Sequence, residues 1–283
     1  MKIIKFKKIS LLFFTLISFV VFAQEEENKE GQSRESQAMD ATATQWSFQL
    51  AYQSMPDYYD DLVNGEPRRP GLTNYLQLRV VAPIPLKGLT ILPRLTFRHY
   101  EDLSNGKSGI GNTELFALII PGFTDWGSGR AGIGPLVTFP GNPDVAKDEW
   151  GYGFAAAIVN NTGQWFYGLL FTQSFRAVDP NALSPEESDV NPLGIAPFVA
   201  YRFGKTGLYL QTADIVALYD WKGGGFYLPV GLRFGKVWVF EKSSLNVYAE
   251  YRTSAVYKNW KGSAVKNSYR FNISYTIPVG KKK

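Results

Sequence analysis

The sequence predicts an all-β chain that folds as a transmembrane, up-and-down, antiparallel β-barrel of about 12 strands. Three observations support this prediction: apolar residues alternate with polar or small ones, the alternating segments approach ten residues, and long connections alternate with short ones. Alternation places two different environments on the two faces of a strand. A soluble β-sandwich alternates as well, but its strands usually have about 5–6 residues, whereas a tilted strand needs about ten to cross a bilayer.

The first 23 residues predict a signal peptide, so residues 1–23 are expected to be removed on export. Four of the first eight residues are lysines, and the apolar stretch 9–23 ends in the small residue Ala23, as a signal peptidase requires. A retained anchor is the alternative, but this stretch is shorter than the roughly 20 residues of a membrane-spanning helix. Residues 24–44 are polar and predict a flexible periplasmic leader, and residues 45–283 form the predicted barrel.

Twelve segments of the predicted barrel follow the period of a β-strand. In the first segment, Trp46 and Phe48 share one face, while Ser47 and Gln49 share the other. The fourth segment is apolar on both faces, so its orientation stays open and the strand count could differ by two. The predicted strands are 45–53, 74–81, 89–98, 112–120, 130–139, 150–158, 165–171, 195–201, 208–210, 226–234, 245–251 and 269–277.

The connections between these strands differ regularly in length. The long ones are 54–73, 101–109, 141–149, 178–192, 214–224 and 254–266, and the short ones are 82–88, 122–129, 160–163, 204–207 and 241–244. Strict alternation is typical of outer-membrane barrels, which have long extracellular loops and short periplasmic turns. The pattern therefore predicts a barrel in the outer membrane of a Gram-negative-type bacterium, in contact with lipid and monomeric.

Several stretches resemble a known family of bacterial outer-membrane barrels. They are GIGPLVTFP at 132–140, a tryptophan-led strand of small residues at 150–159, and YLPVGLRFGKVWVF at 227–240. The sequence is similar there to the family grouped with meta-pathway phenol-degradation proteins, which are thought to be uptake channels. The resemblance spans about 111–278 and implies an uptake channel for aromatic solutes. The lysines at 281–283 depart from the terminal aromatic residue on which outer-membrane strands commonly end.

Charged residues in the predicted strands fall on the face opposite the apolar one. An arginine facing lipid at mid-bilayer would cost about 2–4 kcal/mol, so this placement supports the predicted orientation. The predicted pore-lining residues are Arg79, Arg94, Arg98, Arg130, Arg202, Arg233, Glu250, Arg252 and Arg270. Two interpretations stay open. The arginines could favour anionic or polar solutes, or they could fill the lumen by pairing with Glu250, tyrosines and backbone groups.

Composition excludes several classes of function. The chain has no cysteine and one histidine, which excludes disulfide scaffolds, thiolate metal sites and cysteine nucleophiles. The net charge of +5 comes from 30 basic and 25 acidic residues. Because four of the basic residues lie in the predicted signal peptide, no nucleic-acid partner is expected. No phosphate-binding loop or carboxylate pair stands out, so no cofactor and no metal are expected.

The sequence also predicts that the chain is not an enzyme. His99 could pair with a serine hydroxyl at Ser104 or Ser108, but no third group orients such a pair. An outer-membrane hydrolase is therefore the least favoured alternative.

Together these observations predict a channel for passive uptake of small molecules, with the class of solute open between anionic, polar and aromatic. The alternative is a non-conducting barrel whose long loops, 54–73 and 178–192, mediate adhesion or assembly.

Overall fold

The computed structural model describes residues 33–40, 42–59, 62–63, 66–67, 73–103, 106–176, 192–221, 223–260 and 265–279. The predicted signal peptide and residues 24–32 of the predicted leader lie outside the described residues, as does most of the predicted loop 178–192. The long loop 54–73 is described only in part.

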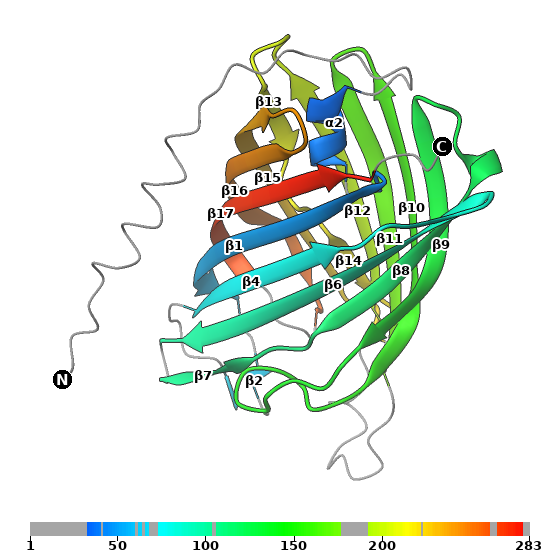
Figure 1. Cartoon of the computed structure of the whole chain (residues 1–283). Coiled ribbons are helices and arrows are strands. Elements are labelled where there is room, and N and C mark those ends of the chain that lie inside the picture. The colour runs from blue at the N-terminus through cyan, green and yellow to red at the C-terminus, as the bar shows by residue number, and fades with distance from the viewer. Residues whose placement is uncertain are drawn as a thin grey trace, which may run out of the picture.

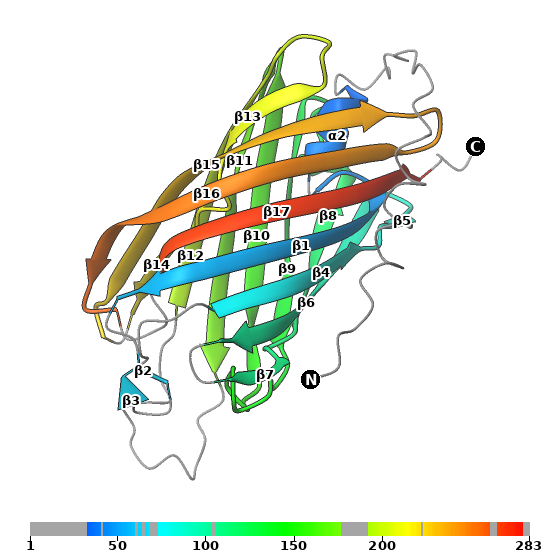
Figure 2. The same ribbon diagram turned by 90° about the vertical axis from the view of Figure 1, so that its left-hand side faces the viewer.

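Twelve antiparallel barrel strands form one closed sheet (Figures 1 and 2). They are β1 (Gln45–Tyr58), β4 (Thr73–Val81), β6 (Leu89–Asp102), β8 (Glu114–Pro121), β9 (Gly129–Thr138), β10 (Gly151–Thr162), β11 (Trp165–Arg176), β12 (Pro192–Arg202), the pair β13 (Leu208–Thr212) and β14 (Ala217–Asp220), which share one position, β15 (Phe226–Val239), β16 (Ser244–Lys258) and β17 (Val265–Pro278). The first strand closes the sheet on the last, from Gln45 opposite Pro278 to Tyr58 opposite Val265. The predicted fold class is confirmed.

Several short elements lie at the rims of this barrel. Two of them, β5 (Ile84–Leu86) and β7 (Lys107–Ile110), form hairpins with β6 at its two ends. Strands β2 (Leu62–Val63) and β3 (Glu66–Pro67) pair with each other, and η1 (Gly122–Thr124) lies between β8 and β9. No helix among the described residues is long and apolar enough to cross a membrane.

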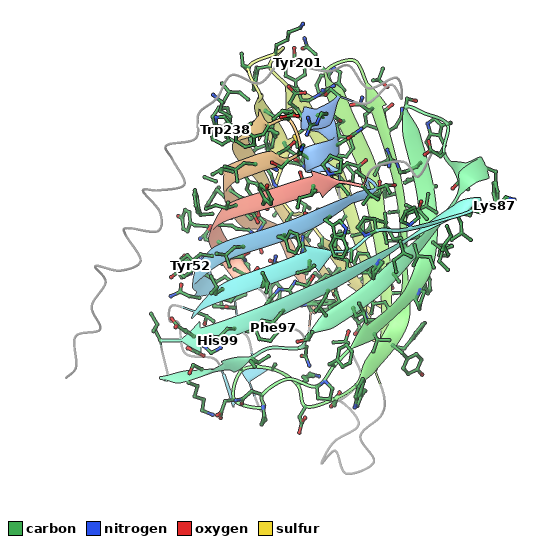
Figure 3. All side chains as sticks on the ribbon, viewed as in Figure 1. Tyr52, Lys87, Phe97, His99, Tyr201 and Trp238 are labelled. Atoms are coloured by element: carbon green, nitrogen blue, oxygen red, sulfur yellow. The ribbon has the colours of Figure 1, made fainter. Side chains whose placement is uncertain are left out.

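The two faces of the barrel wall follow the alternation of the sequence. Along β1, Trp46, Leu50 and Tyr52 are exposed on the outside, while Ser47 and Gln53 are buried inside. Tyr52 is labelled on the outer side of the wall in Figure 3. An outer surface of apolar and aromatic side chains matches lipid rather than water.

The fourth barrel strand, whose orientation the sequence leaves open, has a defined inner face in the structure. In β8, Phe116, Leu118 and Ile120 are buried, whereas Ile119 is exposed. Phe116 and Leu118 belong to a cluster with Val81, Leu92, Ile120, Leu136, Ala155 and Ala157. This strand is apolar on both faces because its outer face contacts lipid and its inner face packs against side chains of neighbouring strands.

The predicted long loop 214–224 is wrong. The chain returns to the sheet at β14, which pairs with β12 from Pro192 opposite Asp220 to Ile195 opposite Ala217. Only four residues, 213–216, interrupt the barrel strand, and the amide of Ala213 donates to the carbonyl of Gly231 at 2.9 Å. Because of this interruption, Asp214 lies between two strands of the wall rather than in a long loop. The connection from Asp220 to β15 is short.

The predicted flexible leader also differs from the structure over residues 33–44. Residues Arg34–Met39 form the helix α2, capped by Ser33, whose side chain accepts from the amide of Ser36 at 3.3 Å. The helix lies inside the barrel, near the end with the short turns (Figures 1 and 2). Ser36 is 0% exposed. Apart from Met39, these residues are polar or small, and partners on the surrounding barrel wall order them.

We expect replacement of Gly134 by alanine to destabilise the wall. A Cβ at this position would overlap the carbonyl oxygen of Ala117 on β8, and the backbone shift should lower the free energy of unfolding by about 1–3 kcal/mol. Urea unfolding in detergent micelles measures this change. The control is Ile133→Val at the next position, on the outer face. Equal stability of Gly134→Ala and wild type would contradict the close approach of β8 and β9.

Candidate functional site inside the barrel

Strand register brings charged side chains of three neighbouring strands together. Arg233 lies opposite Glu250, and Glu250 lies opposite Arg270, so each inward side chain has a charged neighbour on the next strand. The Glu250 Oε2 atom is 2.7 Å from Arg233 Nη2 and accepts from Arg233 Nε at 2.9 Å. On its other oxygen, Oε1, Glu250 forms an ion pair with Arg252 Nε at 3.2 Å. Glu250 therefore forms ion pairs with two guanidinium groups at once, and one positive charge of the three groups is left over.

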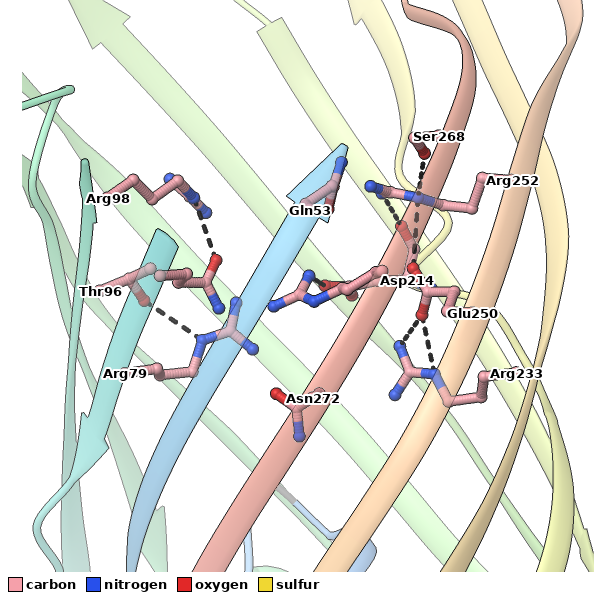
Figure 4. Close-up of polar contacts among 12 residues, drawn as sticks. Gln53, Arg79, Thr96, Arg98, Asp214, Arg233, Glu250, Arg252, Ser268 and Asn272 are labelled. Atoms are coloured by element: carbon pink, nitrogen blue, oxygen red, sulfur yellow. Dashed lines mark hydrogen bonds and ion pairs between the residues drawn. The ribbon is translucent and has the colours of Figure 1, made fainter. Parts of the chain in front are cut away.

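Asp214 enters the same region from the interruption between β13 and β14 (Figure 4). Its Oδ2 atom is 3.3 Å from Arg270 Nη1. Its carbonyl accepts from Arg252 Nη1 at 2.9 Å, and its amide donates to Glu250 Oε2 at 3.1 Å. Asp214 was not among the predicted lumenal residues, because the sequence predicts a long extracellular loop over 214–224. The only signal was negative: alternation stops after Leu210.

Three further arginines reach the lumen from β4 and β6. Arg79 Nε donates to Thr96 Oγ1 at 3.3 Å, and Arg98 Nε donates to Gln77 Oε1 at 3.0 Å (Figure 4). These two bonds fix the guanidinium groups without neutralising their charge.

Arg94 has both a charged and an aromatic partner. Its Nη2 atom is 3.5 Å from Glu114 Oε1, and its guanidinium lies 4.0 Å from the centre of the Phe116 ring. Glu114 adds a third carboxylate to Glu250 and Asp214, and it was not among the predicted pore-lining residues.

Together these residues form one group that we call the arginine cluster. It comprises Arg79, Arg94, Arg98, Arg233, Arg252 and Arg270, with the carboxylates of Asp214, Glu250 and Glu114. Six cations against three anions leave an excess of positive charge. Within the described part of the chain, Arg94 Nε and the Nε and Nη2 atoms of Arg270 are buried without a hydrogen-bond partner. Buried donors of this kind can bind an anion.

The remaining two predicted pore-lining residues, Arg130 and Arg202, lie apart from the arginine cluster. They contact the N-terminal segment inside the barrel, residues 33–40 and 42–43, which we call the plug. Arg130 Nη2 is 3.9 Å from Asp40 Oδ2, and its Nη1 donates to the carbonyl of Thr42 at 3.4 Å. Arg202 donates to the Ser33 hydroxyl. These two arginines hold the plug in place.

An internal cavity of about 130 Å³ separates the arginine cluster from the apolar side of the lumen. Arg79, Arg94, Asp214 and Arg233 line one side of this cavity, and the plug closes it toward the short turns. The apolar lining includes Phe116, Leu118, Leu170, Pro197 and Phe198. The volume exceeds what a single water needs, so a small organic molecule fits this space.

The other sequence candidates do not form a site in the described structure. Among the described residues, no group of three or more histidine, cysteine, aspartate or glutamate side chains could hold a metal.

Comparison with known proteins identifies the architecture. No family model matches the sequence, and no curated protein matches it. Among solved structures, an outer membrane channel from Pseudomonas putida F1 is similar, with 15% identity over 89% of this chain and 99% of that chain, at a TM-score of 0.61. Outer membrane phospholipase A from Escherichia coli has 12% identity over 82% of this chain and 95% of that chain, at a TM-score of 0.49.

These identities show the fold alone. The fold is that of an outer-membrane β-barrel, which places the protein in the outer membrane. The more specific resemblance to the phenol-degradation family is not confirmed.

The prediction that the chain is not an enzyme requires correction. One of the similar structures, the phospholipase, is an enzyme by its name. Independently of that likeness, an outer-membrane barrel does not by itself exclude catalysis, because function depends on residues placed on a fold rather than on the fold. The one histidine of the sequence, His99, lies exposed on β6 (Figure 3).

Proposed function

We propose that the protein, after removal of residues 1–23, acts as a monomeric outer-membrane channel for small anionic or polar molecules. Solutes cross by passive diffusion, and the arginine cluster selects among them. Rings of charged side chains are a general means of selectivity in pores, since they concentrate ions of opposite sign at the constriction.

The observation that carries this proposal is the set of buried, unpartnered guanidinium donors in the arginine cluster. If the arginines served only to fill the lumen, their donors would be paired, because an unpaired buried donor costs about 1–3 kcal/mol. Instead, Arg94 Nε and two nitrogens of Arg270 have no partner among the described residues. Arg94 also lines the cavity, so an anion in that space has a guanidinium group beside it.

The double variant Arg79→Gln/Arg94→Gln is expected to reduce anion selectivity. Both residues line the cavity, and their removal should lower the anion-to-cation permeability ratio by about threefold or more. Reversal potentials of single channels in planar bilayers under a KCl gradient give this ratio. The matched control, Lys87→Gln/Lys205→Gln, removes two charges from exposed positions in the short turns and should leave the ratio unchanged.

Two results would contradict the proposal. One is a wild-type channel that prefers cations, and the other is a folded wild-type protein that neither conducts nor passes any small solute in liposome-swelling assays.

A further inference from the structure

The plug is bonded to one part of the barrel wall. Arg34 donates to the carbonyls of Glu241 and Ser243, at 3.0 and 3.2 Å, in the turn between β15 and β16. Ser36 Oγ donates to Asn161 Oδ1 of β10 at 2.9 Å. With Arg130 of β9 and Arg202 of β12, these contacts tie the plug to β9, β10, β12 and the β15–β16 turn.

A second cavity lies beside the plug, against β1. It has a volume of about 30 Å³ and is lined by Asp40 and Ala43 of the plug and by Gln45, Ser47 and Val81 of the wall. Gln45 is the first residue of β1, and Thr44 before it pairs with Val279 after the last strand. The second cavity is therefore at the periplasmic rim of the barrel.

The two cavities share a boundary. Ala38, Met39 and Gln49 line both of them. The Met39 side chain packs against a cluster that contains Tyr209 and against another that contains Phe166. A methionine side chain is unbranched and has three rotatable bonds, so it changes conformation more readily than the β-branched or aromatic residues around it.

We infer that solutes pass alongside the plug, between Met39 and Gln49, from the large cavity to the small one, while the plug stays bound. Met39 then sets the size limit of the passage. This inference rests on the proposed channel function. The competing mechanism is a channel that conducts only when the plug leaves the lumen.

Substitution of Met39 tests the size limit. Met39→Ala is expected to raise single-channel conductance about twofold, and Met39→Trp to lower it by about half, since conductance follows the narrowest point of a pore. The matched control is Met55→Ala, because Met55 is a buried methionine near the far end of β1. Heat-modifiable migration on gels verifies that each variant is folded. Equal conductance of both Met39 variants and wild type would overturn the inference.

A reversible cross-link tests whether the plug stays bound. The chain has no cysteine, so the variant Ser36→Cys/Asn161→Cys carries the only two thiols, at positions whose native side chains are hydrogen-bonded. A short bis-methanethiosulfonate reagent bridges them, and a reductant releases the bridge. We expect the bridged protein to conduct as the unbridged protein does, with bridging verified by mass spectrometry.

The outcomes separate this inference from the proposed function. If wild type conducts but bridging abolishes conductance and reduction restores it, the plug must leave, and the side passage is wrong while the channel function stands. If wild type does not conduct at all, both the channel function and the side passage are contradicted.

Discussion

Replacement of Glu250 by glutamine is expected to lower the free energy of unfolding by about 3–5 kcal/mol, the usual cost of removing one partner from a buried ion pair. The Glu250 side chain is 0% exposed and those of Arg233 and Arg252 are 13% and 17% exposed. Water therefore cannot solvate the two guanidinium groups in place of the lost carboxylate. Glutamine keeps the size of the side chain but leaves two guanidinium groups without their counter-charge. The amide of Asp214 would also lose its carboxylate acceptor.

Urea titration in detergent micelles, followed by tryptophan fluorescence, measures this loss. The matched control is Asp144→Asn, which removes a carboxylate that pairs with Lys107 at 3.1 Å, where the two side chains are 53% and 44% exposed. Its effect should stay below about 1 kcal/mol, as for exposed pairs. If the two variants are equally stable, Glu250 does not organise the arginine cluster.

Deletion of residues 33–43 is expected to raise single-channel conductance by on the order of tenfold, because it removes the side chains that close the cavity toward the periplasm. The deletion includes Ala38, Met39 and Thr42, which line that cavity. It also removes Asp40, the partner of Arg130, so the lumen should become more positive and anion selectivity should be retained.

Planar-bilayer recordings measure this effect, with deletion of residues 25–32 as the control that shortens the chain upstream of the plug. Unchanged conductance after deletion of residues 33–43 would mean that the plug does not limit flow. Enlarged conductance in the control as well would mean that upstream residues, rather than the plug, restrict the pore.

The wall of the barrel could be predicted from the sequence because the polarity of each wall residue indicates whether its side chain faces the outside or the lumen. Leu50 contacts the outside and Gln53 the lumen, and neither assignment depends on knowing a distant partner. The plug could not be predicted in this way. Ser36 and Ala38 carry no apolar periodicity, and they are buried only because Asn161 and Tyr209, far away in the chain, surround them.

The candidate site shows the same limit. Alternation placed the arginines on the inner face, as with Arg233 and Arg270, but pairing depends on which residues lie opposite each other on neighbouring strands. Asp214 was missed because a four-residue interruption of a strand looks like the start of a loop. Arg79 belongs to the arginine cluster and Arg130 holds the plug. This difference could be predicted only with the position of α2.

The closure of the barrel has a consequence for its biogenesis. The plug is continuous with β1, and β1 is the strand that pairs with β17 to close the sheet. The contacts of the plug come from strands in the middle and later part of the chain, such as β10 and β12. Seating the plug therefore requires those strands to be in place, so closure of the wall and filling of the lumen become one step of assembly. A closed barrel without its plug, which would let solutes leak across the membrane, therefore need not form during assembly.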